Sequence, residues 1–202
     1  MNAFYNKQGI GDVLRVQLQT ETPEKIRTEM SGDVTLIKDE SDAITGFNLF
    51  NASQYISVPE TGSIDVSEQL VTELQNALEK NSIDYVLEVD LTPKFVVGYV
   101  ESMEKHPNAD KLNVCQVQVG TEQLQIVCGA PNVAAGQKVV VAKVGAVMPS
   151  GLLIKDAELR GVASSGMVCS AKELALPDAP EEKGILVLKD DEEIGSLFEV
   201  KA

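Results

Sequence analysis

The sequence of 202 residues contains no tryptophan, few phenylalanines and tyrosines, one histidine and three cysteines. A core made from this composition has to be aliphatic, and its many short Val and Ile runs favour strands. The three cysteines, at positions 115, 128 and 169, form no CxxC pair, and a zinc site needs about four clustered Cys or His ligands. We therefore expect free thiols in or near strands, with no metal, no cofactor and no disulfide framework.

Long apolar runs are also missing. No run reaches the roughly 18 residues that a membrane helix needs, and the most apolar stretch, residues 139–148, is interrupted by Lys143. The first residues, MNAFY, lack the basic start and the apolar stretch of a signal peptide. We expect a cytoplasmic protein that makes no use of a membrane.

The residue patterns of common enzymes do not emerge from this sequence. There are no paired carboxylates and no triad, and nothing marks a cysteine or a serine as an activated partner of His106. His106 is therefore interpreted as a structural loop residue. We expect no catalytic activity, although folding could still bring scattered residues together.

Negative charge dominates the composition, with a net charge of −14 that is unusual for a protein that binds nucleic acid. Its distribution is uneven. Residues 1–92 carry 6 basic and 16 acidic side chains, residues 94–176 carry 8 and 7, and residues 177–202 carry 3 and 8. The nearly neutral central segment permits a local basic face.

The first half of the chain predicts a small acidic α+β domain over residues 1–92. Leu70, Leu74 and Leu78 recur at the spacing of one helix face, which predicts an amphipathic helix over residues 67–80. Ser67 suits its N-cap, and Asn81 ends it. Short alternating stretches predict strands at residues 13–18, 34–37, 44–50 and 85–91.

The second half predicts a barrel. Pro93 biases Thr92 toward extended backbone, so this dipeptide marks a natural boundary between residues 1–92 and 93–202. Glycines separate short strands, and a five-stranded Greek-key OB-fold is the economical fold at this size. The fold class is thus β-rich α+β. The expected strands are residues 95–103, 112–119, 123–128, 138–144, 151–154, 167–170 and 184–188, with a short helix at 171–176.

Several ordered runs in this half carry a resemblance to a known family. They read VVGYV at 96–100, KHPNADKL at 105–112, QIVCGAPNV at 125–133, LRGV at 159–162 and SSGMVCSAKE at 164–173. The half resembles the tRNA-binding OB domain at the N-terminus of the bacterial phenylalanyl-tRNA synthetase β-subunit. The whole chain is similar to free-standing YtpR-type bacterial tRNA-binding proteins, which place a small domain before the barrel. Since the synthetase subunit continues far beyond its barrel, we expect a free-standing protein.

The resemblance and the residue chemistry together give a set of candidate RNA contacts. Loops between OB strands dock oligonucleotides, and a guanidinium binds phosphate in a bidentate manner. The resemblance implies a phosphate contact for one lysine, at 111, and RNA-facing positions for the Ser and Met of the SSGM run. Each of three residues also has an interpretation without RNA contact. Lys111 could be an ordinary solvated lysine, Asn132 could form a tight turn, and Met167 could belong to the core. The predicted contacts are Lys111, Asn132, Lys143, Lys155, Arg160, Ser164, Met167 and Lys172.

These features predict a non-catalytic protein that recognises the shape and backbone of tRNA. Phe95 and Tyr99 are the only aromatic residues of the barrel before the acidic tail, so base stacking is a weak candidate. An alternative function is an adaptor that docks an aminoacyl-tRNA synthetase or a ribosomal partner. A homodimer is also open, because relatives of the barrel can dimerise.

Overall fold

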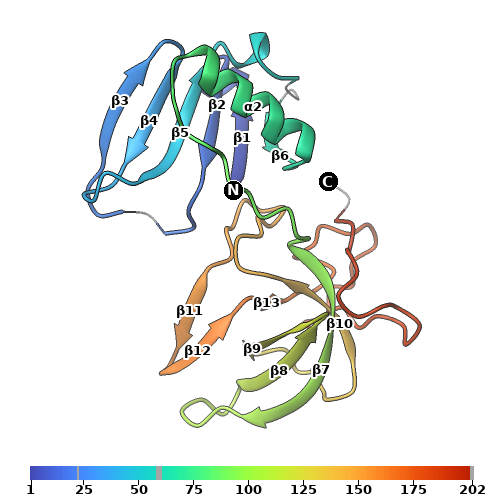
Figure 1. The fold of residues 1–202 in the computed structure, drawn as a ribbon. Helices are drawn as coiled ribbons and strands as arrows, with labels where there is room; N and C mark the ends of the chain where they lie inside the picture. The colour runs from blue at the N-terminus through green and yellow to red at the C-terminus, as the bar shows by residue number, and fades with distance from the viewer. Residues whose placement is uncertain (22, 58–60, 201–202) are drawn as a thin grey trace. The chain divides into compact units, whose positions relative to one another are not determined.

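A computed structural model describes residues 1–21, 23–57 and 61–200. The chain divides into two compact units, Met1–Thr92 and Pro93–Ala202. Each unit has hydrophobic clusters of its own, and strands predominate in both (Figure 1), which confirms the β-rich α+β class. Within the described ranges, no helix is long and apolar enough to cross a membrane.

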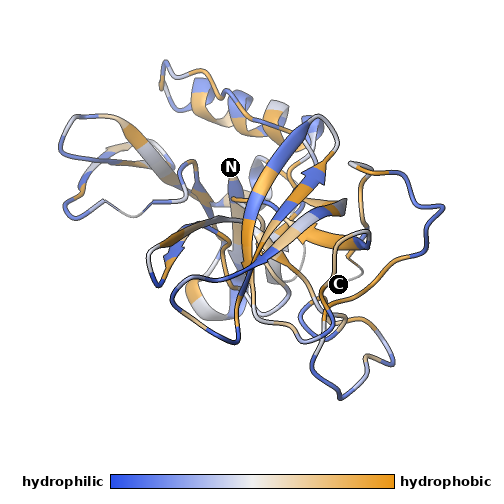
Figure 2. Ribbon diagram, turned by 90° about the horizontal axis from the view of Figure 1, so that it is seen from below, coloured by the Kyte–Doolittle hydropathy of each residue, from blue (hydrophilic) through white to orange (hydrophobic). Residues whose placement is uncertain are grey.

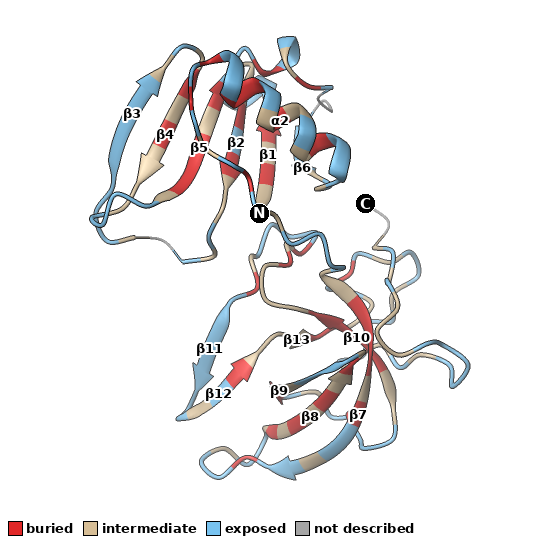
Figure 3. Ribbon diagram, in the orientation of Figure 1, coloured by how far each residue is buried: buried red, intermediate tan, exposed pale blue. Residues whose placement is uncertain are grey.

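The first unit is one antiparallel sheet with one long helix on a face. Its six strands follow the order β3-β4-β5-β2-β1-β6. Figure 3 shows buried residues on the central strands and exposed residues along the edge strand β3. The elements are β1 (Asn2–Asn6), α1 (Lys7–Ile10), β2 (Val13–Gln17), β3 (Arg27–Ser31), β4 (Val34–Lys38), β5 (Ile44–Phe50), η1 (Ala52–Gln54), β6 (Thr61–Ile64) and α2 (Glu68–Lys80).

Helix α2 has the boundaries that its sequence predicts. The Ser67 hydroxyl accepts a hydrogen bond from the Leu70 N–H at 3.2 Å, which satisfies one N–H that the first turn leaves unpaired. Apolar residues recur along the helix (Figure 2), and three leucines of its inner stripe are buried against the sheet: Leu70, Leu74 and Leu78. The predicted helix is confirmed, with Asn81 as its C-cap.

The predicted strand at residues 85–91 is wrong. Its alternation of apolar residues is real, since Leu87 is buried and Tyr85 and Val89 pack against the core. Its backbone, however, bonds to a helix side chain: Gln75 Nε2 donates to the Tyr85 carbonyl at 3.1 Å, and the Leu87 N–H donates to Gln75 Oε1 at 3.0 Å. The segment therefore lies along α2 instead of joining the sheet.

The second unit is built on a five-stranded antiparallel sheet with the order β13-β10-β7-β8-β9. Side-chain hydrogen bonds then join β9, at one end of this order, to β12. Gln125 Nε2 donates to the Ala163 carbonyl at 2.8 Å, and the Val127 N–H donates to the Ser164 hydroxyl at 3.0 Å. The strands are β7 (Phe95–Lys105), β8 (Asn113–Val119), β9 (Glu122–Cys128), β10 (Lys138–Ala142), β11 (Asp156–Leu159), β12 (Val162–Ser165) and β13 (Met167–Val168).

The barrel interior is aliphatic and tight. Along β8, buried and half-buried residues alternate, so that Cys115, Val117 and Val119 point into the core. Gly98 on β7 has no room for a side chain, because a Cβ there would lie 2.5 Å from Val141 Cγ2. This curled sheet confirms the predicted OB-type barrel.

Three smaller predictions for this unit differ from the structure. Residues 151–154 form a tight loop with one bridge, Val147 to Leu153, and residues 171–176 form turns instead of a helix. Residues 184–188 are extended, with an isolated bridge from Val187 to Val139 and a hydrogen bond from the Leu186 N–H to the Cys169 carbonyl at 2.9 Å. The hairpin β11–β12 was not expected, because its exposed residues lack an apolar alternation.

Candidate nucleic-acid interface

Two loops of the barrel carry exposed basic side chains that could contact RNA. One is the β7–β8 loop, residues 106–112, and the other is the β11–β12 hairpin inside the long connection from β10 to β13. The hairpin turns through Arg160 and Gly161, whose φ angles are +50° and +86°, between the paired residues Leu159 and Val162. Positive φ at both central residues matches the twist of a two-residue hairpin and leaves the Arg160 side chain exposed at the tip.

His106 joins these two loops. Its ring is buried, with 5% of the residue exposed. Nδ1 lies 3.0 Å from the Asn108 N–H, and Nε2 lies 2.9 Å from the Leu159 carbonyl oxygen. A backbone N–H can only donate, so Nδ1 has to accept and Nε2 has to carry the proton. This assigns the neutral Nε2–H tautomer and makes the histidine a structural link.

Asn108 adds a second link between the same loops. Its Nδ2 donates to the Arg160 carbonyl at 3.1 Å. The β7–β8 loop is itself closed by a hydrogen bond from the His106 N–H to the Leu112 carbonyl at 3.1 Å. Lys111 and Arg160 are thus exposed on two loops that the buried histidine and its neighbour hold together.

Three other residues predicted to contact RNA form hydrogen bonds or an ion pair with other parts of this protein. Lys143 is 18% exposed and pairs with Glu122 at 2.9 Å. The buried Ser164 hydroxyl accepts from β9, and the Asn132 amide bonds to both backbone groups of Ile185, at 2.8 and 3.0 Å. These bonds give each of the three residues a structural role.

The remaining three predicted contacts are spread over the unit. Lys155 is exposed immediately before β11, on the hairpin side of the interface. Lys172 is exposed in a turn that a Ser170–Glu173 capping box closes, with hydrogen bonds of 2.7 and 3.2 Å. Met167 is partly buried against a hydrophobic cluster that includes Val140, Ala142 and Leu174, which favours the packing alternative.

Acidic residues lie among the basic ones on both loops. Residues 104–111 contain Lys105 and Lys111 with two acids, and residues 155–160 contain Lys155 and Arg160 with two more. Each segment is therefore neutral overall. Few phosphates can be contacted at once, so affinity should be modest and its dependence on salt shallow.

The sequence reasoning missed four glutamines on β8 and β9. Gln116 and Gln118 alternate with core residues on one strand, and Gln123 and Gln125 do so on the next. In an OB-fold, the face of the second and third strands is where oligonucleotides bind, and β8 and β9 hold these places here. The repeated Gln-x-Gln spacing was the signal that could have found them.

The cysteines form no site. All three are buried free thiols, as expected. Burial raises the pKa of Cys115 to about 11 and of Cys169 to about 12, and it also raises the pKa of Cys128. Within residues 1–21, 23–57 and 61–200, no group of three or more His, Cys, Asp or Glu side chains could hold a metal ion.

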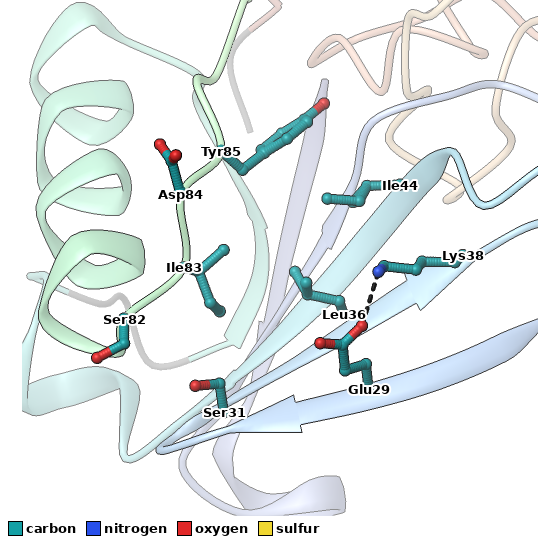
Figure 4. A pocket seen from close by; sticks show the side chains of 9 residues that line it. All are labelled: Glu29, Ser31, Leu36, Lys38, Ile44, Ser82, Ile83, Asp84 and Tyr85. Atoms are coloured by element: carbon teal, nitrogen blue, oxygen red, sulfur yellow. Dashed lines mark hydrogen bonds and ion pairs between the residues drawn. The ribbon is translucent and has the colours of Figure 1, made fainter.

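A cavity of about 230 Å³ lies in the first unit (Figure 4). Its charged lining is largely satisfied, because Lys38 Nζ pairs with Glu29 at 2.6 Å. The other lining side chains are two serines, three aliphatic residues, one aspartate and one tyrosine. The lining residues are Glu29, Ser31, Leu36, Lys38, Ile44, Ser82, Ile83, Asp84 and Tyr85.

Comparison with known proteins identifies the barrel. A family model described as "Putative tRNA binding domain" matches residues 95–197. The chain belongs to the tRNA-binding domain family. It is 64% identical over 200 residues to the "Putative tRNA-binding protein YtpR" of Bacillus subtilis, covering 98% of this chain and 100% of that protein.

Other similar proteins match a part of this chain. The phenylalanine–tRNA ligase beta subunit of Oceanobacillus iheyensis is 52% identical over 132 residues, which are 63% of this chain and 16% of the subunit. A crystal structure of the C-terminal domain of Plasmodium vivax p43 aligns at 28% identity with 52% of this chain and 59% of that one, at a TM-score of 0.38. Residues 21–90 match a "Domain of unknown function (DUF4479)".

Proposed function

We propose that the protein binds tRNA without catalysing a reaction, and that the barrel contacts the RNA backbone through its two joined loops. The observation that carries this proposal is the link made by His106 and Asn108, which holds Lys111 and Arg160 on adjacent loops of a tRNA-binding-family barrel. Loops at these positions in an OB-fold are where oligonucleotides dock. Cationic side chains there suit phosphate oxygens.

Recognition by shape fits the chemistry of these loops. Duplex RNA hides its base edges in a narrow groove and exposes phosphates and 2′-hydroxyls, so a protein with few aromatic residues reads it through the backbone. A general single-strand binder would need several stacking platforms. The barrel has Phe95 and Tyr99 before its acidic tail.

The cellular setting belongs to the same proposal. A tRNA binder of this kind works in the cytoplasm, and the likeness to a synthetase subunit makes a synthetase a reasonable physical partner. The chain spans 16% of the length of that subunit, so the activity of the synthetase is not carried over. These relatives give no support to an adaptor that docks such a partner in place of binding tRNA. They do not bear on a homodimer, which stays a prediction.

Two charge-removing variants test the site. Lys111→Ala removes an exposed ammonium, and Arg160→Asn removes the guanidinium while keeping a residue that tolerates positive φ. Each should weaken binding of labelled tRNA and reduce the slope of log K against log salt by roughly 0.7 to 0.9. Lys183→Ala, which removes one exposed positive charge elsewhere in the same unit, is the control. Wild-type slopes in both loop variants would place the RNA contact elsewhere.

A further inference from the structure

In the first unit, α2 packs against one face of the six-stranded sheet (Figure 1), and the other face carries half-buried and exposed side chains. Residues directly opposite each other on neighbouring antiparallel strands share a face. A row of such pairs crosses five strands, from Phe4 on β1 to Met30 on β3, and Phe50 lies beside this row at the end of β5. The outer face is defined by Phe4, Arg15, Asn48, Thr35, Met30 and Phe50.

The strand residues that form this outer face include no carboxylate. The six strands of the first unit contain a single acidic residue, Glu29. It lies opposite the buried Leu36, on the side of the sheet that faces α2, and its carboxylate pairs with Lys38 there. Residues 1–92 hold 16 acidic side chains in all. A face without acids in so acidic a unit is complementary to an anionic partner.

Arg15 lies near the middle of the outer face. It is exposed, with Phe4 opposite it on β1 and Asn48 opposite it on β5. Among the described residues, its guanidinium forms no ion pair. The neighbouring Asn48 Oδ1 has no hydrogen-bond partner within the same ranges. The guanidinium is thus available to a phosphate, which it can bind in a bidentate manner.

Large apolar side chains share the outer face with this arginine. Phe4 is half-buried, Phe50 is 41% exposed and Met30 is 73% exposed. An antiparallel sheet that faces water on one side normally presents polar residues there, so these side chains need another explanation. Aromatic rings on an open antiparallel sheet are platforms on which unpaired bases stack. Rings beside a free guanidinium therefore suit a single-stranded nucleic acid.

The size and the charge of the outer face argue against a second copy of the chain as its partner. Six strands about 4.8 Å apart, each with about five residues of roughly 3.3 Å, span a projected area of roughly 480 Å². A standard protein interface buries about 800 Å² on each partner. A twofold contact would also bury two Arg15 guanidiniums, and the face has no carboxylate to pair with them. A nucleic-acid strand needs less area and supplies the negative charge.

We propose that the outer face binds unpaired nucleotides of RNA, with Arg15 on a phosphate and with bases stacked on Phe4 and Phe50. This goes beyond the proposed function, because it assigns an RNA site to residues outside the matched tRNA-binding domain at 95–197. The rest of the first unit is acidic, so the face by itself binds weakly. When the barrel holds the same RNA, the second contact becomes intramolecular and adds to the affinity. A single strand that occupies the face leaves tRNA bound to the barrel.

The test compares two charge reversals in the full chain. Arg15→Glu places a carboxylate in the middle of the outer face. Lys80→Glu makes the same change of charge at an exposed position on α2 and is the matched control. Phe50→Leu removes one stacking ring and keeps an apolar side chain. Thermal melting of each variant checks folding, and sedimentation velocity measures the oligomeric state.

Fluorescence anisotropy at low salt uses two labelled probes, an oligouridine of about eight nucleotides and bulk tRNA. We expect weak binding of the oligouridine to the wild-type protein. Arg15→Glu and Phe50→Leu should each raise its Kd at least about 5-fold, the effect of losing a phosphate contact or one stacked base, whereas Lys80→Glu should stay within about 2-fold of wild type. The Kd for tRNA should rise in the same two variants.

Equal Kd values in Arg15→Glu and Lys80→Glu for both probes would overturn the outer-face site and leave the proposed function standing. A wild-type dimer that Arg15→Glu dissociates, with no change in oligouridine binding, would also overturn it and make a second copy the partner. Binding of the oligouridine that depends on Arg15, in a protein that does not bind tRNA, would support the site and overturn the proposed function.

Discussion

At the scale of single residues, the buried ring of His106 links the β7–β8 loop to the β11–β12 hairpin. The run from His106 to Asp110 predicts a turn with a structural histidine, and the buried ring with two hydrogen bonds agrees with that. The partner of the ring, the Leu159 carbonyl, is 53 residues away and could not be predicted. For the same reason the partners of Ser164, Asn132 and Lys143 within the protein could not be predicted, and the roles of these residues toward RNA stay predictions.

The cysteines give a prediction at this scale. Burial holds the thiol pKa of Cys115 at about 11 and that of Cys169 at about 12, above the value near 8.5 of an unfolded chain. A group whose pKa is raised by folding stabilises the native state fully below the unfolded pKa. That contribution is lost as pH rises through the folded pKa. We expect the urea midpoint of the second unit to fall as pH rises from about 9 toward 11.

The matched variant is Cys169→Ala, which should lower stability at neutral pH but show a smaller loss on going to alkaline pH. Labelling of the native protein with a thiol reagent at pH 8 should be slow at all three positions, because reaction needs the thiolate. Rapid labelling of a cysteine in the native state, or an equal alkaline loss in the variant, would contradict this account of the buried thiols.

At the scale of elements, helices and strands were predicted correctly where the spacing of apolar residues matched the face that packs against the core. Helix α2 has a cap, a leucine stripe and a stop signal, so it was found with its boundaries. The edge strand β3 was missed because it is almost wholly exposed and shows no apolar alternation. The segment at 85–91 has the alternation of a strand, but the Gln75 side chain takes its backbone hydrogen bonds.

The cap of α2 gives the prediction for this scale. Ser67→Ala removes the oxygen that accepts from the Leu70 N–H and should destabilise the first unit by about 1 kcal/mol. Urea denaturation followed by circular dichroism of the helix measures this. Ser67→Asp is the control, since aspartate caps about as well as serine. An unchanged midpoint in the alanine variant, or an equal loss in both, would show that the cap does not stabilise the helix.

At the scale of the whole molecule, the distribution of charge reconciles the acidic composition with RNA binding. The first unit carries 16 of the acidic side chains against 6 basic ones, whereas residues 94–176 are nearly neutral. A net charge of −14 repels nucleic acid at long range, so binding has to come from short-range contacts on the barrel. Modest affinity and a shallow salt slope follow from this balance.

The measurement that tests the central claim most directly is anisotropy of labelled bulk tRNA titrated with the full chain, from low to physiological salt. Unlabelled single-stranded RNA and duplex DNA serve as competitors. The account predicts saturable binding that tRNA reverses and that neither competitor reverses at equal nucleotide concentration. The absence of binding at low salt, or equal displacement by all three nucleic acids, would contradict a barrel that recognises tRNA.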